Sequence, residues 1–199
     1  MSSMPDRRCF LSGLTAVGLV AALPGRASAF STAEANALIT KVVADITSII
    51  NSGRSESSMF VKFERLFATY ADVPRIAQLV LGPDNRRATA AERVAFTKAF
   101  QGYMSRKYGR RFREFIGGKI VVNGTRAVKS YYEVVTTALL TGEAPFEVVF
   151  VVADSNGLFI DMKIEGISLI KAERTEIGSM LDRRKGNIGL LIEDLKAAG

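Results

Sequence analysis

Residues 146–165 read FEVVFVVADSNGLFIDMKIE, in which two runs of β-branched and aromatic side chains flank the turn-forming residues Asp154 to Gly157. Such an arrangement predicts two strands joined as an antiparallel hairpin. Similar runs occur upstream, and together they predict strands at 119–123, 128–140, 146–153 and 158–165. The middle of the chain is therefore expected to form an antiparallel sheet.

Helices are predicted on both sides of this sheet. Ser31 to Glu34 and Thr89 to Glu92 have the spacing of a capping box, in which a Ser or Thr and a Glu three residues later satisfy the first turn. Apolar spacing, with glycine and proline stops, predicts helices at 32–52, from Phe60 to Tyr70, from Asp72 to Gly82, from Thr89 to Gly117, at 171–184 and at 187–197. Helices, then an antiparallel sheet, then helices define the α+β class.

Residues 1–29 have the pattern of a cleaved signal peptide. Arg7 and Arg8 precede the apolar run 11–23, and Ala27-Ser28-Ala29 supplies the small residues of a cleavage site. The run is shorter than the roughly 20 residues that a membrane-spanning helix needs. The paired arginines resemble a twin-arginine export signal, although an ordinary secretory leader with two chance arginines has the same pattern. We expect export to the periplasm of a Gram-negative type of cell.

The mature chain, residues 30–199, is expected to form a single domain. It remains basic, since removal of residues 1–29 leaves 24 of the 27 Lys and Arg and 19 of the 20 Asp and Glu, and export favours lipid or protein partners over nucleic acid. The only cysteine, Cys9, lies in the leader, and histidine is absent. The mature protein therefore lacks thiol nucleophiles, disulfides, a histidine base and the usual nitrogen and sulfur ligands of zinc.

Three stretches of the mature chain resemble the MlaC (toluene-tolerance) family of periplasmic phospholipid-binding proteins. They are DVPRIA at 72–77 with VLG at 80–82 and Glu92-Arg93 before Phe96, then DMKIEGISL at 161–169, and finally Arg174 followed by Gly186 and Leu190-Leu191. The chain departs from the family pattern in two places. Phe159 stands where a Trp is frequent, and Ala172-Glu173-Arg174 stands where the family often has Asn-Tyr-Arg. These departures place the chain on a divergent branch and leave a hopanoid or another polycyclic lipid open as the ligand.

The resemblance implies an NTF2-like fold, in which a curved antiparallel sheet and the N- and C-terminal helices enclose an apolar pocket for acyl chains. It implies a monomeric carrier without a cofactor, metal or catalytic residue, whose cargo is a phospholipid or related membrane lipid. The implied partners are an inner-membrane MCE-type ABC transporter complex and an outer-membrane lipoprotein–porin complex. Two other classes stay open: an adaptor that carries no cargo, and an enzyme that uses Asp154, Asp161 or Glu165 as acid and base.

Candidate lipid contacts come from the apolar faces of the predicted helices and strands. They are Phe67, Ile76, Val80, Phe100, Tyr103, Met104, Tyr108, Phe112, Val134, Phe150, Val152, Ile160 and Met162, any of which could equally be ordinary core. Arg174 matches the family pattern and could pair with a headgroup phosphate or with Glu165. A basic cluster, Arg106, Lys107, Arg110, Arg111 and Arg113, could meet an anionic membrane surface or form a solvated face.

Overall fold

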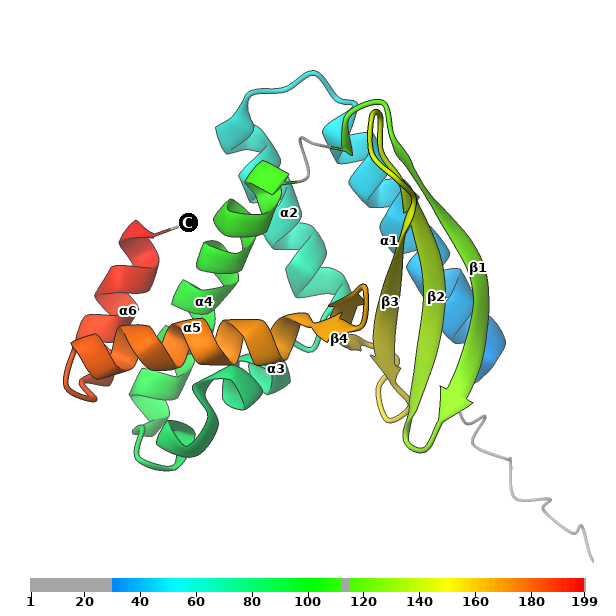
Figure 1. Cartoon of the computed structure of the whole chain (residues 1–199). Coiled ribbons are helices and arrows are strands. Elements are labelled where there is room, and N and C mark those ends of the chain that lie inside the picture. Colours follow the sequence, from blue (N-terminus) through cyan, green and yellow to red (C-terminus); the bar gives the residue numbers. More distant parts are fainter. Residues whose placement is uncertain (1–29, 112–114, 199) are drawn as a thin grey trace, which may run out of the picture.

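The computed structural model describes residues 30–111 and 115–198 (Figure 1). The predicted signal peptide and Phe112 lie outside the described residues. The helices are α1 (Thr32–Ile50), α2 (Glu56–Tyr70), α3 (Val73–Leu81), the short 3-10 helix η1 (Gly82–Arg86), α4 (Ala90–Arg111), α5 (Leu169–Arg183) and α6 (Ile188–Ala197). The strands are β1 (Lys119–Val128), β2 (Tyr131–Leu139), β3 (Phe146–Ala153), β4 (Phe159–Ile164) and β5 (Ile167–Ser168). The α+β class is confirmed.

The helices begin where the predicted caps stand. Ser31 and Glu34 form a reciprocal capping box at the start of α1, and Thr89 and Glu92 do the same at the start of α4. The side chain of Asp72 accepts from the amide of Arg75 and caps α3. These bonds satisfy amides that the first turn of a helix otherwise leaves without partners.

Some helix ends differ from the predictions. α1 stops at Ile50, and Asn51 bonds back to its last turn as the C-cap. α4 is described as far as Arg111, and at 115–118 the chain forms a turn, in which the amide of Gly118 donates to the carbonyl of Phe115, so the helix does not extend to Gly117. In α5 the helix begins at Leu169 rather than 171, because the hydroxyl of Ser168 accepts from the amide of Lys171.

The sheet is antiparallel throughout, with strand order β1-β2-β3-β4-β5. The predicted β3–β4 hairpin is confirmed. The prediction that the first strand ends at 123 is wrong, because β1 crosses a register shift between Val122 and Gly124 and continues to Val128. Lys129, at a positive φ of 55°, then makes the turn into β2, so the second strand begins at Tyr131 rather than at 128. β5 was not predicted.

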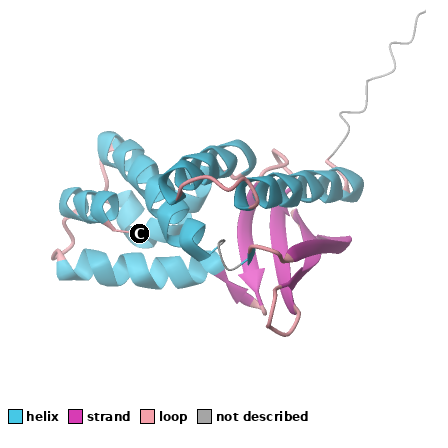
Figure 2. Cartoon of the chain, turned by 90° about the horizontal axis from the view of Figure 1, so that it is seen from above, coloured by secondary structure: helices cyan, strands magenta, loops and turns pink. Residues whose placement is uncertain are grey.

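Two hydrophobic clusters make up the interior. One joins α1 and α2 to the inner face of β2 and β3, and the other joins α3, α4, α5 and α6. Figure 2 shows α1 lying along one face of the sheet, while the other helices gather beside the end of the sheet. Phe159 on β4 packs against both clusters. The space between the two clusters is therefore bounded by the sheet on one side and by helices on the other.

Candidate functional site: an apolar pocket between sheet and helices

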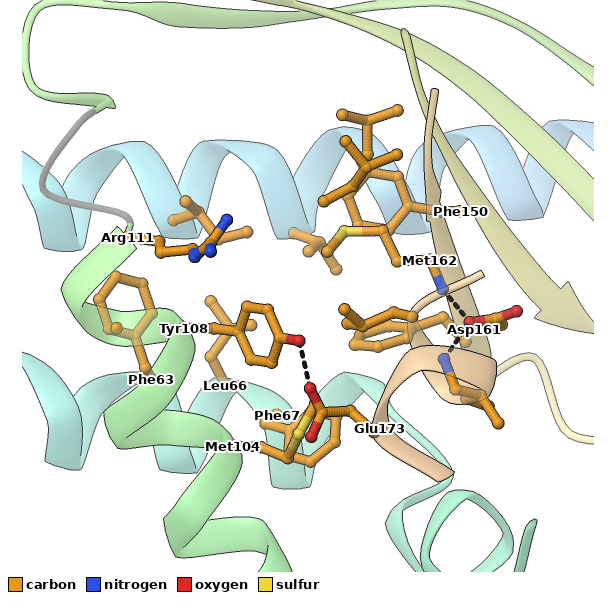
Figure 3. A pocket seen from close by; sticks show the side chains of 18 of the residues that line it. Phe63, Leu66, Phe67, Met104, Tyr108, Arg111, Phe150, Asp161, Met162 and Glu173 are labelled. Atoms are coloured by element: carbon orange, nitrogen blue, oxygen red, sulfur yellow. Dashed lines mark hydrogen bonds between the residues drawn. The ribbon is translucent and has the colours of Figure 1, made fainter. Parts of the chain in front are cut away.

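A cavity of about 360 Å³ lies between the two hydrophobic clusters. Its walls come from α1, α2, α3, α4, α5 and the strands β1, β3 and β4. Figure 3 shows aromatic and aliphatic side chains pointing into it, with Arg111 at one end and Asp161 at the other. The volume lies within the range of about 300–1,000 Å³ that is usual for small-molecule pockets.

The structure brings many of the predicted contacts to this pocket. The predicted residues that line it are Phe67, Ile76, Val80, Phe100, Met104, Tyr108, Phe150, Ile160 and Met162. They come from α2, α3, α4, β3 and β4, elements that are widely separated in the sequence. Their convergence on one cavity is a structural observation, whereas their contact with a lipid stays a prediction.

The remaining predicted contacts lie elsewhere. Val134 and Val152 are fully buried in the cluster of α1, α2, β2 and β3, and Tyr103 is buried in the cluster of α3, α4, α5 and α6. The exposed Arg174 packs its guanidinium over Gly82, away from the pocket, and makes no ion pair with Glu165 or with any other described residue. Phe112 is outside the described residues.

Sequence reasoning missed other wall residues that had a readable signal. Phe146 and Val148 line the pocket beside Phe150, and all three share one face of β3 because side chains alternate along a strand. The same alternation could have added Ile164 to Met162 on β4. From α1, Val42 and Ile46 also line the pocket, although helical periodicity alone identifies them only as an apolar face. Leu66 and Phe63 complete the wall on α2.

A buried polar cluster interrupts the apolar wall. Glu173 is 1% exposed, and its Oε1 accepts hydrogen bonds from the Tyr108 hydroxyl and, at 2.7 Å, from Lys107 Nζ. Lys107 Nζ also donates to the hydroxyl of Tyr103 at 2.9 Å. Glu173 Oε2 is buried and has no hydrogen-bond partner among the described residues. The cluster ties α4 to α5 across the wall of the pocket.

The surroundings keep the donors of this cluster protonated. Burial raises the pKa of Tyr108, and its hydrogen bond to Glu173 raises it further. Burial lowers the pKa of Lys107, but its hydrogen bonds to Glu173 and Tyr103 outweigh that effect, and the net shift is upward. At neutral pH Lys107 is therefore a cation and Tyr108 a neutral hydroxyl, and both hold the Glu173 carboxylate in place.

Unlike Glu173, the other carboxylates at the pocket make no ion pair with any described residue. Asp161 Oδ1 accepts from the amides of Met162 and Ile170, and its Oδ2 accepts from the Ser168 hydroxyl. These bonds make Asp161 a structural residue at the β4–α5 junction. Glu143 and Glu165 are exposed at the rim. Among the described residues, no group of three or more acidic side chains could hold a metal ion.

The described helices include none with both the length and the hydrophobicity of a membrane span. The fold and the pocket together define an α+β protein built around an apolar cavity, an arrangement suited to a hydrocarbon ligand. The profile of the MlaC protein family matches residues 40–197, and the chain belongs to this family.

One solved structure shows how far the fold is shared. It is a phospholipid-binding protein from Ralstonia solanacearum, in complex with a phospholipid, which superimposes with a TM-score of 0.70 and is 20% identical. The match covers 82% of this chain and 95% of that chain. No curated protein matches the chain. At this identity the likeness establishes the common fold of the two proteins.

Proposed function

We propose that this protein is a periplasmic lipid carrier, which holds the acyl chains of a phospholipid in the pocket and shuttles the lipid between membranes. The observation that carries the proposal is the cavity itself, whose walls are almost entirely aliphatic and aromatic. Family membership and the phospholipid in the Ralstonia protein support the same ligand class. The carrier exchanges cargo with an inner-membrane MCE-type ABC transporter complex and an outer-membrane lipoprotein–porin complex.

Energetics explains why such a lipid needs a carrier. Moving two chains of about 30 methylenes in all into water costs on the order of 24 kcal/mol, at about 0.8 kcal/mol per methylene. An apolar cavity removes this cost for the methylenes that it encloses, so that transfer from the membrane to the protein becomes correspondingly less unfavourable. The carrier then needs no catalytic residue, and the complexes at the two membranes set the direction of transport.

The test is native mass spectrometry of the mature protein purified from periplasm, followed by organic extraction of whatever is bound. We expect one phospholipid per protein, and transfer of that lipid to acceptor vesicles. A hopanoid in the extract would mean that the ligand is a polycyclic lipid, and the assignment as a carrier would stand. A protein that is repeatedly empty and takes up no lipid from vesicles would favour an adaptor, and turnover of the extracted lipid would favour an enzyme.

A further inference from the structure

Four residues of the basic cluster lie on α4, where their contacts can be compared, and Arg113 lies outside the described residues. The guanidinium of Arg106 donates to the carbonyl oxygens of Leu195 and Ala198, at 2.6 and 2.9 Å, and so ends α6. Lys107 pairs with the buried Glu173 at 2.7 Å. Arg110 pairs with Glu56 at 3.4 Å and stacks over the ring of Phe60. These three side chains therefore stabilise contacts between helices.

Arg111 is different in two respects. It is exposed, and within the part of the chain that the structure describes it makes no hydrogen bond or ion pair. It is also the only lysine or arginine among the described residues that line the pocket. Figure 3 shows its side chain at the end of the cavity, beside Phe63 and Tyr108. A guanidinium without a partner among the described residues therefore lies where a largely apolar cavity meets solvent.

The chemistry of this position matches a lipid phosphate. A lipid whose chains fill the cavity keeps its headgroup at the rim, and a guanidinium binds phosphate oxygens with paired, charge-assisted hydrogen bonds. Glu143 and Glu165 are also exposed at the rim, but neither is ion-paired with Arg111. We infer that Arg111 binds the phosphate of the lipid headgroup at the mouth of the pocket, an inference that rests on the proposed function.

Arg174 provides the matched control for this assignment. Like Arg111, it is an exposed arginine without an ion pair among the described residues, but it lies over Gly82 and outside the pocket. The sequence left two partners open for Arg174, a headgroup phosphate or Glu165, whereas its position in the fold lies outside the pocket. Replacing each arginine by glutamine therefore removes the same charge from two surfaces, of which one borders the cavity.

The experiment compares two lipids that differ only in the phosphate. One set of dioleoylphosphatidylcholine vesicles carries trace phosphatidic acid, and a second set carries trace diacylglycerol with identical fluorescent acyl chains. Each protein is loaded from both sets, and the ratio of phosphatidic acid to diacylglycerol loaded is measured. Because both lipids are measured on the same protein, a loss of folded protein cancels in this ratio. We expect Arg111→Gln to lower the ratio about two- to fivefold, the upper part of the range for an exposed charge pair. Arg111→Lys should restore part of it, and Arg174→Gln should leave it unchanged.

Two further conditions sharpen the result. Raising the ionic strength should lower the ratio for the wild-type protein and change it little for Arg111→Gln, because salt screens exposed charges. Inorganic phosphate at the same ionic strength as a chloride control should not lower phosphatidic acid loading further. If it does, and Arg111→Gln abolishes this effect but leaves the ratio of the two lipids unchanged, Arg111 binds free phosphate and the assignment to a lipid headgroup is wrong.

The remaining outcomes separate the two proposals. Loading of both lipids with a ratio that Arg111→Gln leaves unchanged would overturn the role of Arg111 and keep the pocket as a lipid site. A lower ratio in Arg174→Gln alone would transfer the headgroup contact to Arg174. Failure of the wild-type protein to load either lipid would overturn the carrier and the headgroup site together.

Discussion

Glu173 is the residue at which the wall of the pocket departs most from an apolar lining. A buried carboxylate is tolerated when it is paired and hydrogen-bonded, and Lys107 and Tyr108 supply both conditions at Oε1. The sequence shows Glu173 only as a departure from the family's Asn-Tyr-Arg pattern. Its partners are remote in the chain, on α4, and no local spacing connects them with α5.

The first prediction concerns the stability that this pair provides. Removing one partner of a fully buried ion pair costs about 3–5 kcal/mol. Lys107 keeps 33% of its side chain exposed and can be partly rehydrated, so we expect Glu173→Gln to cost less, about 1–3 kcal/mol. Urea unfolding at pH 7 measures the change. Glu176→Gln, at an exposed position of the same helix, is the control and should change stability by less than about 0.5 kcal/mol.

Glu133 leads to a prediction about pH. This buried side chain on β2 accepts from Lys163 and Arg126, whose hydrogen bonds lower the pKa of Glu133 below its ordinary value of 4.5. A lowered pKa in the folded state means that the stabilisation is present above the unfolded value and is lost as pH falls through the folded value. We expect Glu133→Gln to be less stable than wild type at pH 7, by about 1 kcal/mol.

Urea unfolding of both proteins from pH 7 down to pH 3 checks this expectation. The difference between them should shrink progressively once the pH is below the ordinary value of 4.5. A difference that stays constant over this range would show that the contribution of Glu133 does not depend on its charge.

At the scale of elements, the junction between β4 and α5 explains why the 161–169 stretch has its residue pattern. Asp161 fastens the strand to the start of the helix through Ser168 and Ile170, as described above. Glu165 and Gly166 turn the chain between β4 and β5, both at positive φ, which glycine adopts without strain. Ser168 then caps α5. The stretch is therefore a structural joint that directs α5 across the end of the pocket.

A cap substitution tests this joint. Ser168→Ala removes the cap of α5 and leaves Asp161 Oδ2 without its donor, so we expect a loss of about 1–2 kcal/mol. Ser179→Ala, at an exposed position of the same helix, should lie within about 0.5 kcal/mol of wild type. The urea midpoints of the two variants provide the comparison, and equal midpoints would mean that the cap contributes nothing measurable.

At the scale of the whole molecule, the cavity exists because the two hydrophobic clusters meet only partly. Each cluster packs its own helices closely, and the space between them remains for a ligand. A packed core and a cavity wall therefore differ in what a polar substitution does. In the core it leaves a buried polar group without partners, whereas at the wall the group can be hydrated while the affinity for hydrocarbon falls.

Two methionines provide a matched pair for this difference. Met180 is buried in the helical cluster, and Met162 lines the pocket. We expect Met180→Gln to cost about 2–4 kcal/mol of stability and Met162→Gln about 1 kcal/mol or less. Met162→Gln should, in contrast, lose most of its lipid loading per folded protein. Urea unfolding and lipid extraction of both variants measure the two effects. If Met162→Gln unfolds as easily as Met180→Gln and loads lipid normally, Met162 does not contact the lipid.

Local chemistry in the sequence was enough to predict the class of fold and most of its elements. Capping boxes, turn residues and runs of β-branched side chains act over a few residues, so that α1, α3, α4 and the β3–β4 hairpin could be placed without knowledge of the rest of the chain. Features that depend on a partner strand escaped prediction: the register shift in β1 and the two-residue β5 are formed by pairing. Several family motifs also carried more structural than binding information, as Asp161 shows.

Only the tertiary structure decided which apolar residues border a cavity and which charges are free. Phe150 and Val152 have the same strand face and similar sequence surroundings, yet Phe150 lines the pocket and Val152 is buried in the cluster of α1, α2, β2 and β3 without lining the pocket. Arg106, Arg110 and Arg111 look alike in the sequence, but contacts with α6 and α2 use the first two and leave Arg111 at the rim. The reason is physical: periodicity identifies the face of an element that turns inward, whereas a cavity and an unpaired charge depend on distances between elements that are far apart in the chain.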